Sequence, residues 1–147
     1  MFSGDNMRLL GRHGILVKMY REAKWFFQRG IKGYCEKDLW SIDHWLATTF
    51  PKMLDEYNTV NLGYPDGFED KMRRCILAGE LSFIDENRIL GGDTEDDYAT
   101  WRNTVREMSR LLRGTNLENG TVTDDEAIEN MEHALALLKI CYFDLFW

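Results

Sequence analysis

Proline and cysteine are scarce in this chain, and it has no long apolar run. Only two prolines occur in 147 residues, so little in the sequence interrupts a helix. The three cysteines lie far apart and form no CxxC pair, which argues against a thiolate zinc site and favours free thiols in a reducing compartment. The apolar stretch 15–17 ends at Lys18, too short for a signal-peptide core, and nothing approaches the ~20 apolar residues of a membrane span.

The sequence is acidic and rich in aromatic residues. It contains 18 Lys and Arg against 25 Asp and Glu, a net charge of −7. Such a balance argues against a general binder of nucleic acid or of anionic membranes. Apolar residues make up 44% of the chain, and its length is that of one domain with one core. We therefore expect a single helical domain over residues 1–147, located in the cytoplasm, with neither nucleic acid nor membrane as a partner.

Apolar residues recur at three- and four-residue spacing and predict an all-α, single-domain bundle of about five helices. Capping-box patterns stand at residues 35–38, 94–97 and 123–126. Pro51 is expected to kink or interrupt the second helix. The expected helices cover about 15–29, about 35–57, about 69–84, 98–112, and 124 to near the C-terminus.

The predicted apolar faces also suggest which residues are buried. Trp101 is expected in the core, and so is Leu135, on the last helix. That helix has an apolar stripe at residues 128, 131, 135, 138, 142 and 145. The second helix is apolar on two sides, and the C-terminal turns are apolar nearly all round. Together they present more apolar surface than a single small domain can easily bury. We therefore expect a homo-oligomer that buries Phe146, Trp147 or Trp40 between subunits.

The sequence offers no catalytic, metal or cofactor set. The three histidines fall in unrelated segments, and no Ser or Cys stands in a glycine-flanked elbow. Glu129 and His133 form one Glu/His pair, but the second pair that a carboxylate-bridged metal site in a helical bundle requires is missing. The glutamates at 126, 129 and 132 resemble the first half of the magnesium-binding motif of helical nucleotide hydrolases, but the ExxD motif that should follow is missing. His44, beside Asp43 and one turn from Trp40, is either a site histidine or a histidine satisfied at an interface.

Two groups of basic residues are candidates for binding an anion. Four arginines of one expected helix lie within about 80° of arc at about 100° per residue, and only Arg110 has an acidic neighbour at pairing distance, Glu107. Either carboxylates from another helix neutralise them, or a phosphate-bearing ligand or acidic partner does. The four are Arg102, Arg106, Arg110 and Arg113.

The second basic group surrounds the turn 30–33, beside Tyr34 and Trp40. Backbone N–H groups of such a turn can hold phosphate while an aromatic side chain stacks on a base. The alternative is that these residues only cap and pack the helix. The basic residues are Arg21, Lys24, Arg29 and Lys32.

The pattern RGxxGYxxxDxWxxDxxLA covers residues 29–47, and a GYP loop follows at 63–65. Together with a Trp-bearing helix and a C-terminal segment rich in Leu, these motifs resemble a family of small, helical proteins of tailed bacteriophages whose function is unassigned. The similarity extends from about Trp25 to the C-terminus. Cys35 stands where the family often has Ser, and Phe146 and Trp147 stand near the place of an acidic residue. The resemblance implies a phage or prophage origin and the host cytoplasm, and it implies no reaction.

These observations predict a non-catalytic protein that binds and sequesters a small nucleotide-like immune signal, without a cofactor. The alternative is an acidic inhibitor or accessory factor that binds a host protein. A metal-dependent nucleotide hydrolase is a third, less favoured reading, because its carboxylate motif is incomplete. The candidate ligand-binding residues are Arg29, Lys32, Tyr34, Trp40, His44, Arg102, Arg106 and Arg110.

Overall fold

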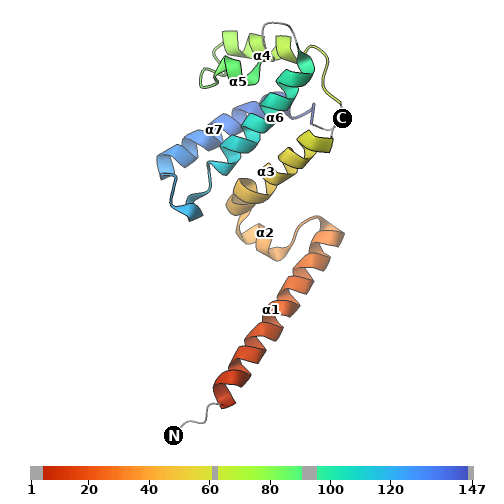
Figure 1. Ribbon diagram of the computed structural model, residues 1–147, viewed down its shortest axis with the longest axis vertical. Helices are drawn as coiled ribbons and strands as arrows, with labels where there is room; N and C mark the ends of the chain where they lie inside the picture. Colours follow the sequence, from red (N-terminus) through yellow and green to blue (C-terminus); the bar gives the residue numbers. More distant parts are fainter. Residues whose placement is uncertain (1–4, 61–62, 91–95, 146–147) are drawn as a thin grey trace. The chain divides into compact units, whose positions relative to one another are not determined.

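The computed structural model describes residues 5–60, 63–90 and 96–145, with side chains from residue 14 onward except those of Trp40 and Asn119. Every regular element in these ranges is helical, which confirms the all-α class, and five helices have ten residues or more. The chain forms two compact units, residues 1–42 and 43–147. The helices, labelled in Figure 1, are α1 (Asp5–Lys32), α2 (Glu36–Trp40), α3 (Ile42–Val60), α4 (Phe68–Leu77), α5 (Glu86–Ile89), α6 (Asp97–Arg113), the 3₁₀ turn η1 (Leu117–Asn119) and α7 (Asp124–Cys141).

In residues 1–42, the short helix α2 packs against the last turns of α1. Lys24 Nζ lies 2.9 Å from a Glu36 carboxylate oxygen, and the Arg29 guanidinium makes two hydrogen bonds of 2.5 and 3.0 Å to Asp38. The backbone N–H of Cys35 donates to Asp38 at 2.8 Å, the acidic half of the capping box that the sequence predicts there. These polar contacts, together with the buried Cys35, fix the turn between the two helices.

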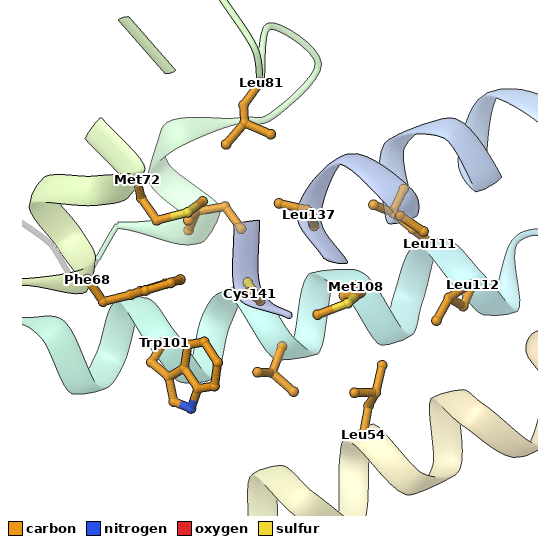
Figure 2. Packing of buried hydrophobic residues seen from close by; sticks show 13 residues of the cluster. Leu54, Phe68, Met72, Leu81, Trp101, Met108, Leu111, Leu112, Leu137 and Cys141 are labelled. Carbon is orange, nitrogen blue, oxygen red and sulfur yellow. The ribbon is translucent and has the colours of Figure 1, made fainter. Parts of the chain in front are cut away.

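In residues 43–147, α6 is the central helix. It runs alongside α7, and α4 and α5 pack on its first half (Figure 1). Apolar side chains from these helices and α3 meet around it, as Figure 2 shows. Trp101 is 1% exposed and makes an edge-to-face contact with Phe68, so its predicted burial is confirmed. The core consists of Leu54, Phe68, Met72, Leu81, Ile89, Trp101, Val105, Met108, Leu111, Leu112, Ala134, Leu137 and Cys141.

Polar contacts tie α3 to α6. The Ser109 hydroxyl lies 3.0 Å from the Pro51 carbonyl and 2.7 Å from Asp55 Oδ1. The Asn58 side chain donates to the Arg102 carbonyl at 3.1 Å. Buried polar groups therefore find partners across this contact, as burial requires.

The helix boundaries differ from the sequence prediction in several places. The predicted second helix divides at Ser41 into α2 and α3, and α3 continues through Pro51 without interruption. Helix α4 ends at Leu77 instead of near residue 84, because Gly79 takes the left-handed conformation (φ +78°) and the N–H groups of residues 78–80 close the helix end. The first helix is longer than predicted and reaches Lys32.

The predicted burial of Leu135 on α7 is wrong, although three residues of the predicted stripe, Met131, Leu138 and Leu145, pack partly buried against the core. Leu135 is 53% exposed, and the neighbouring Leu137 is fully buried instead. The true core face is rotated by about one residue, roughly 100° on a helix. It includes two alanines, small side chains of the kind that let packed helices approach closely. The buried residues of α7 are Ala127, Ala134, Leu137 and Cys141.

Some sequence predictions concern parts of the chain that lie outside the description. Phe146, Trp147 and the side chain of Trp40 are among them, and so is Thr94 of the second capping box. In the described part, Asp96 caps α6 by accepting from the Ala99 N–H at 2.9 Å. The third capping box is confirmed, with Thr123 and Glu126 bonding each other's backbone N–H groups. None of the helices in the described ranges combines the length and apolarity needed to cross a bilayer.

Candidate anion-binding site

The polar face of α6 lines a small cavity together with α5. Asn103, Arg106, Glu107 and Arg110 occupy helix positions i, i+3, i+4 and i+7, so their side chains share one face of α6, away from its core face. With Arg88 of α5 they line a cavity of about 250 Å³, which we call the arginine pocket.

The short helix α5 is held firmly enough to position Arg88. Its last residue, Ile89, is fully buried in the core beside α6. The Asn103 side chain donates to the Ile89 carbonyl at 3.3 Å, and the Asp85 carboxylate caps the start of α5 by accepting from the Asn87 N–H at 3.0 Å. Arg88 therefore faces the polar side of α6 because its neighbour is fixed in the core.

One arginine of the pocket has a carboxylate partner. Arg110 makes two hydrogen bonds to Glu107, of 2.6 and 2.8 Å, as the sequence spacing predicts. The hydrogen bond from Arg110 lowers the pKa of Glu107 despite its partial burial, and the charge of Arg88 lowers it further. The same pairing raises the pKa of Arg110.

The other two arginines of the pocket are less completely neutralised. Arg106 Nη1 donates to the Asn103 side-chain oxygen at 3.1 Å. Within the described ranges, neither Arg88 nor Arg106 lies in a salt bridge of 4 Å or less. Three guanidinium groups and one carboxylate leave the lining with two net positive charges. The pocket is therefore electrostatically incomplete and suited to an anion.

The remaining arginines of α6 have partners within the fold, although the buried Nε of Arg102 makes no hydrogen bond to the described residues. Arg113 pairs with Asp55 of α3 and also donates to the Ser109 hydroxyl at 3.0 Å. Burial alone would raise the pKa of Asp55, but hydrogen bonds from Arg113 and Ser109 lower it. Arg102 donates to the Tyr98 hydroxyl at 3.0 Å, and its guanidinium carbon lies 5.5 Å from the centre of that ring. The Asp55 carboxylate thus pairs with Arg113, whereas Arg106 interacts with Asp55 only through its charge and forms no salt bridge of 4 Å or less with a described residue.

The candidate residues in residues 1–42 line none of the cavities described above, and one of them is already paired with a carboxylate. Arg29 is occupied by Asp38, and the pKa of that carboxyl is well below its usual range because Arg29 donates to it. Lys32 and Tyr34 are exposed. The ion pairs of Arg29 and Lys24 with residues of α2 favour the second of the two interpretations of this basic group, in which its residues cap and pack the helix.

His44 lines a different and larger cavity, of about 430 Å³. His44 Nδ1 lies 3.1 Å from a Glu118 carboxylate oxygen. Three carboxylates and several apolar side chains surround it, an unfavourable setting for a phosphate. We call this the acidic pocket, lined by Asp43, His44, Ala47, Thr115, Asn116, Leu117, Glu118, Asp124, Ala127, Ile128 and Met131.

Of the predicted site residues whose side chains the structure describes, Arg106 and Arg110 are brought together in the arginine pocket, and Arg88 joins them. Arg88 had no sequence signal, since it lies in a four-residue helix without apolar periodicity. In the described part of the chain, no three His, Cys, Asp or Glu side chains cluster in a way that could hold a metal ion. No protein-family model, curated protein or solved structure matches this chain.

Proposed function

We propose that this protein binds a small phosphate-bearing ligand through the arginine pocket and holds it without chemical change. One observation carries the proposal: Arg88, Arg106 and Arg110 converge on one cavity that contains a single carboxylate. Guanidinium groups form paired, charge-assisted hydrogen bonds with phosphate oxygens, which makes arginine the usual residue for this recognition.

The size of the arginine pocket indicates how much of a ligand it holds. A cavity of about 250 Å³ is smaller than the ~300–1,000 Å³ of sites that enclose a drug-sized molecule. It fits a phosphate or phosphodiester group, and the sugar and base of a nucleotide would extend outside it. The ligand class is thus a nucleotide-like molecule recognised by its phosphate.

The biological setting is part of the same proposal. The motif at residues 29–47 resembles a family of phage proteins, which implies action in the cytoplasm of a bacterial host. A phage protein that captures a nucleotide signal without cleaving it would act as a sponge that blunts host immunity. Capture of this kind requires affinity and abundance, and it requires no catalytic group.

Calorimetry against a panel of cyclic and linear dinucleotides tests the proposal. We expect sub-micromolar binding of at least one member, weakened roughly tenfold or more by Arg106→Glu, because the substitution removes a phosphate contact and adds a repelling charge. Lys139→Glu makes the same charge change on an exposed part of α7 and should leave binding unchanged. Binding no tighter than about millimolar across the panel, or equal binding by the two variants, refutes the proposal.

A second candidate function rests on the acidic pocket. Its lining combines three carboxylates, Asp43, Glu118 and Asp124, with apolar side chains, which suits a basic side chain of a partner protein. We propose this protein-binding role as the alternative if no nucleotide binds. In that case Glu118→Gln should weaken capture of a basic partner, whereas Arg106→Glu should not.

A further inference from the structure

The arginine pocket receives guanidinium groups from two helices, and their charge bears on which kind of phosphate it takes. Arg106 and Arg110 belong to α6, whereas Arg88 belongs to α5. Three guanidinium groups and the carboxylate of Glu107 leave the lining with two net positive charges. A terminal phosphate carries about 1.5 to 2 negative charges near pH 7 on three oxygens, whereas an internal phosphodiester carries one charge on two free oxygens.

The side-chain acceptors of the pocket are already engaged. Arg110 donates to both carboxylate oxygens of Glu107, at 2.6 and 2.8 Å. The side-chain oxygen of Asn103 accepts from Arg106 at 3.1 Å, and its amide group donates to the Ile89 carbonyl at 3.3 Å. A protonated phosphate has to donate its O–H, so it would have to share an oxygen that already accepts from an arginine. A fully ionised phosphate only accepts hydrogen bonds and therefore fits this lining better.

The charge of the lining is constant through the pH range in which a terminal phosphate ionises. Glu107 stays ionised because the hydrogen bonds from Arg110 lower its pKa, and arginine side chains stay protonated. Next to the pocket, Asp55 of α3 interacts with Arg106 through its charge, is paired with Arg113, and has a lowered pKa. No histidine is among the described residues that line the pocket. A change of affinity between about pH 5 and about pH 7.5 would therefore report on the ligand.

We infer that the arginine pocket selects the terminal phosphate of a linear nucleotide, in its fully ionised form, over an internal or cyclic phosphodiester. The inference rests on the proposed function and narrows its ligand class from phosphate esters to phosphomonoesters. The two charges of an ionised terminal phosphate match those of the lining, and each of its three oxygens can face a guanidinium group. A phosphodiester leaves one positive charge of the lining without a partner, and two substituents, instead of one, have to leave a cavity of about 250 Å³.

Sets of three dinucleotides with the same two bases test the inference by calorimetry. One is linear with a 5′-terminal phosphate, one is the same molecule without that phosphate, and one is cyclic. Near neutral pH we expect the phosphorylated molecule to bind at least about tenfold more tightly than the other two, because it gains a charge-assisted contact. Inorganic phosphate, which has the same charge but no nucleoside, should bind more weakly than the phosphorylated dinucleotide.

The outcomes separate the inference from the proposed function. If all three dinucleotides of a set bind equally well, or the cyclic one binds most tightly, the site still takes nucleotides and the inference alone is overturned. If no set contains a molecule that binds tighter than about millimolar, the proposed function fails, and the inference falls with it. Equal affinity for inorganic phosphate would overturn the assignment to a nucleotide.

The pH dependence of binding gives a second readout. A terminal phosphate loses its second proton near about pH 6, so only about a tenth of it is fully ionised at about pH 5. The affinity for the phosphorylated dinucleotide should therefore fall about tenfold between about pH 7.5 and about pH 5. The affinity for the cyclic dinucleotide should stay constant, because neither its phosphodiesters nor the lining changes charge in that range. An equally flat profile for both ligands overturns the inference.

Arg88→Gln tests the guanidinium group that α5 supplies. It lowers the net charge of the lining from two to one, so the ratio of the affinities for the phosphorylated and unphosphorylated dinucleotides should fall by about tenfold. Arg74→Gln makes the same change at an exposed arginine of α4 that does not line the pocket, and it should leave the ratio unchanged. Both ligands report on the folded molecules alone, so partial unfolding of a variant does not alter the ratio. An equal ratio in the two variants overturns the inference.

Discussion

The buried carboxylate of Glu69 offers the sharpest test of what holds the larger unit together. Glu69 is fully buried at the start of α4. It accepts hydrogen bonds from the Asp96 N–H at 2.6 Å, from the Thr100 hydroxyl at 3.1 Å and from the Arg73 guanidinium at 2.5 Å. Burial alone would raise the pKa of Glu69, but these hydrogen bonds outweigh it and lower the pKa. The carboxylate thus joins α4 to the beginning of α6.

Glu69→Gln keeps the shape of the side chain and removes its charge. The Asp96 N–H and the Thr100 hydroxyl both donate to Oε2, whereas Arg73 donates to Oε1. The amide oxygen can therefore keep the first two donors, but they lose a charged acceptor, and the amide N–H groups then face Arg73, which loses its acceptor. A hydrogen bond to a charged group contributes about 1.5–3 kcal/mol. Arg73 is 44% exposed and regains water, so its charge is not stranded. We expect the free energy of unfolding in urea to fall by about 1.5–3 kcal/mol near pH 7.

The pH dependence distinguishes lost charge from lost packing. The pKa of Glu69 is lower in the folded protein than its ordinary value of 4.5, so its stabilisation is complete above pH 4.5 and disappears as the pH falls through the folded pKa. The difference in the free energy of unfolding between the parent and Glu69→Gln should therefore become smaller as the pH falls from about 5 to about 3. Glu56→Gln, on an exposed position of α3, is the control and should cost little. A gap of the same size at both ends of that range would refute the electrostatic reasoning.

Three further predictions follow from burial and capping. Leu137→Ala should lower the free energy of unfolding by about 2–5 kcal/mol and Leu135→Ala by under about 1 kcal/mol, because only the first leaves a cavity. Urea titrations of both variants measure this difference, and the opposite order would show that the buried face of α7 is misplaced. Thr123→Ala should cost about 1 kcal/mol through the lost cap of α7, and an unchanged melting curve would contradict this. Burial raises the pKa of Cys141 to about 12, so a maleimide at neutral pH should label Cys75 in the folded protein and Cys141 only after unfolding.

Sequence periodicity predicted α6 well because only one side of it is apolar. The apolar stripe in the sequence is Tyr98, Trp101, Val105, Met108 and Leu112; the last four are buried and Tyr98 is half-buried. The opposite side carries arginines and Asn103, so only one orientation hides the apolar residues. The phase of the stripe and the position of the helix in the core therefore follow from the same pattern.

The same reasoning failed on α7 because its second half is apolar nearly all round. Leu135 and Leu137 are equally apolar, and periodicity alone gives no reason to bury one rather than the other. The buried side also contains the small residues Ala127 and Ala134, which favour close packing against another helix. Helix packing, rather than hydrophobicity, decided the face.

The sequence predicts the part of the candidate site that lies within one helix, but not the part that depends on residues far apart in the chain. The row of arginines on α6 is visible in the sequence, and so is the pairing of Arg110 with Glu107, three residues away. The partner of Arg113 is Asp55, 58 residues away, and Arg88 joins the pocket only because Ile89 is buried. Which arginine lacks a carboxylate is therefore a property of the tertiary structure, and no spacing rule gives it.

The arginine pocket reconciles an acidic chain with an anionic ligand. At physiological ionic strength, charges in water are screened beyond about 8 Å, so a small anion inside the pocket experiences mainly the nearby guanidinium groups. Those groups outnumber the single carboxylate, Glu107, by three to one. An extended polyanion such as nucleic acid would also lie across the surrounding surface, where a chain of net charge −7 repels it. A local positive pocket in an acidic protein thus favours a small phosphate ester over a nucleic acid strand, and it makes the selectivity of the proposed site a consequence of ligand size.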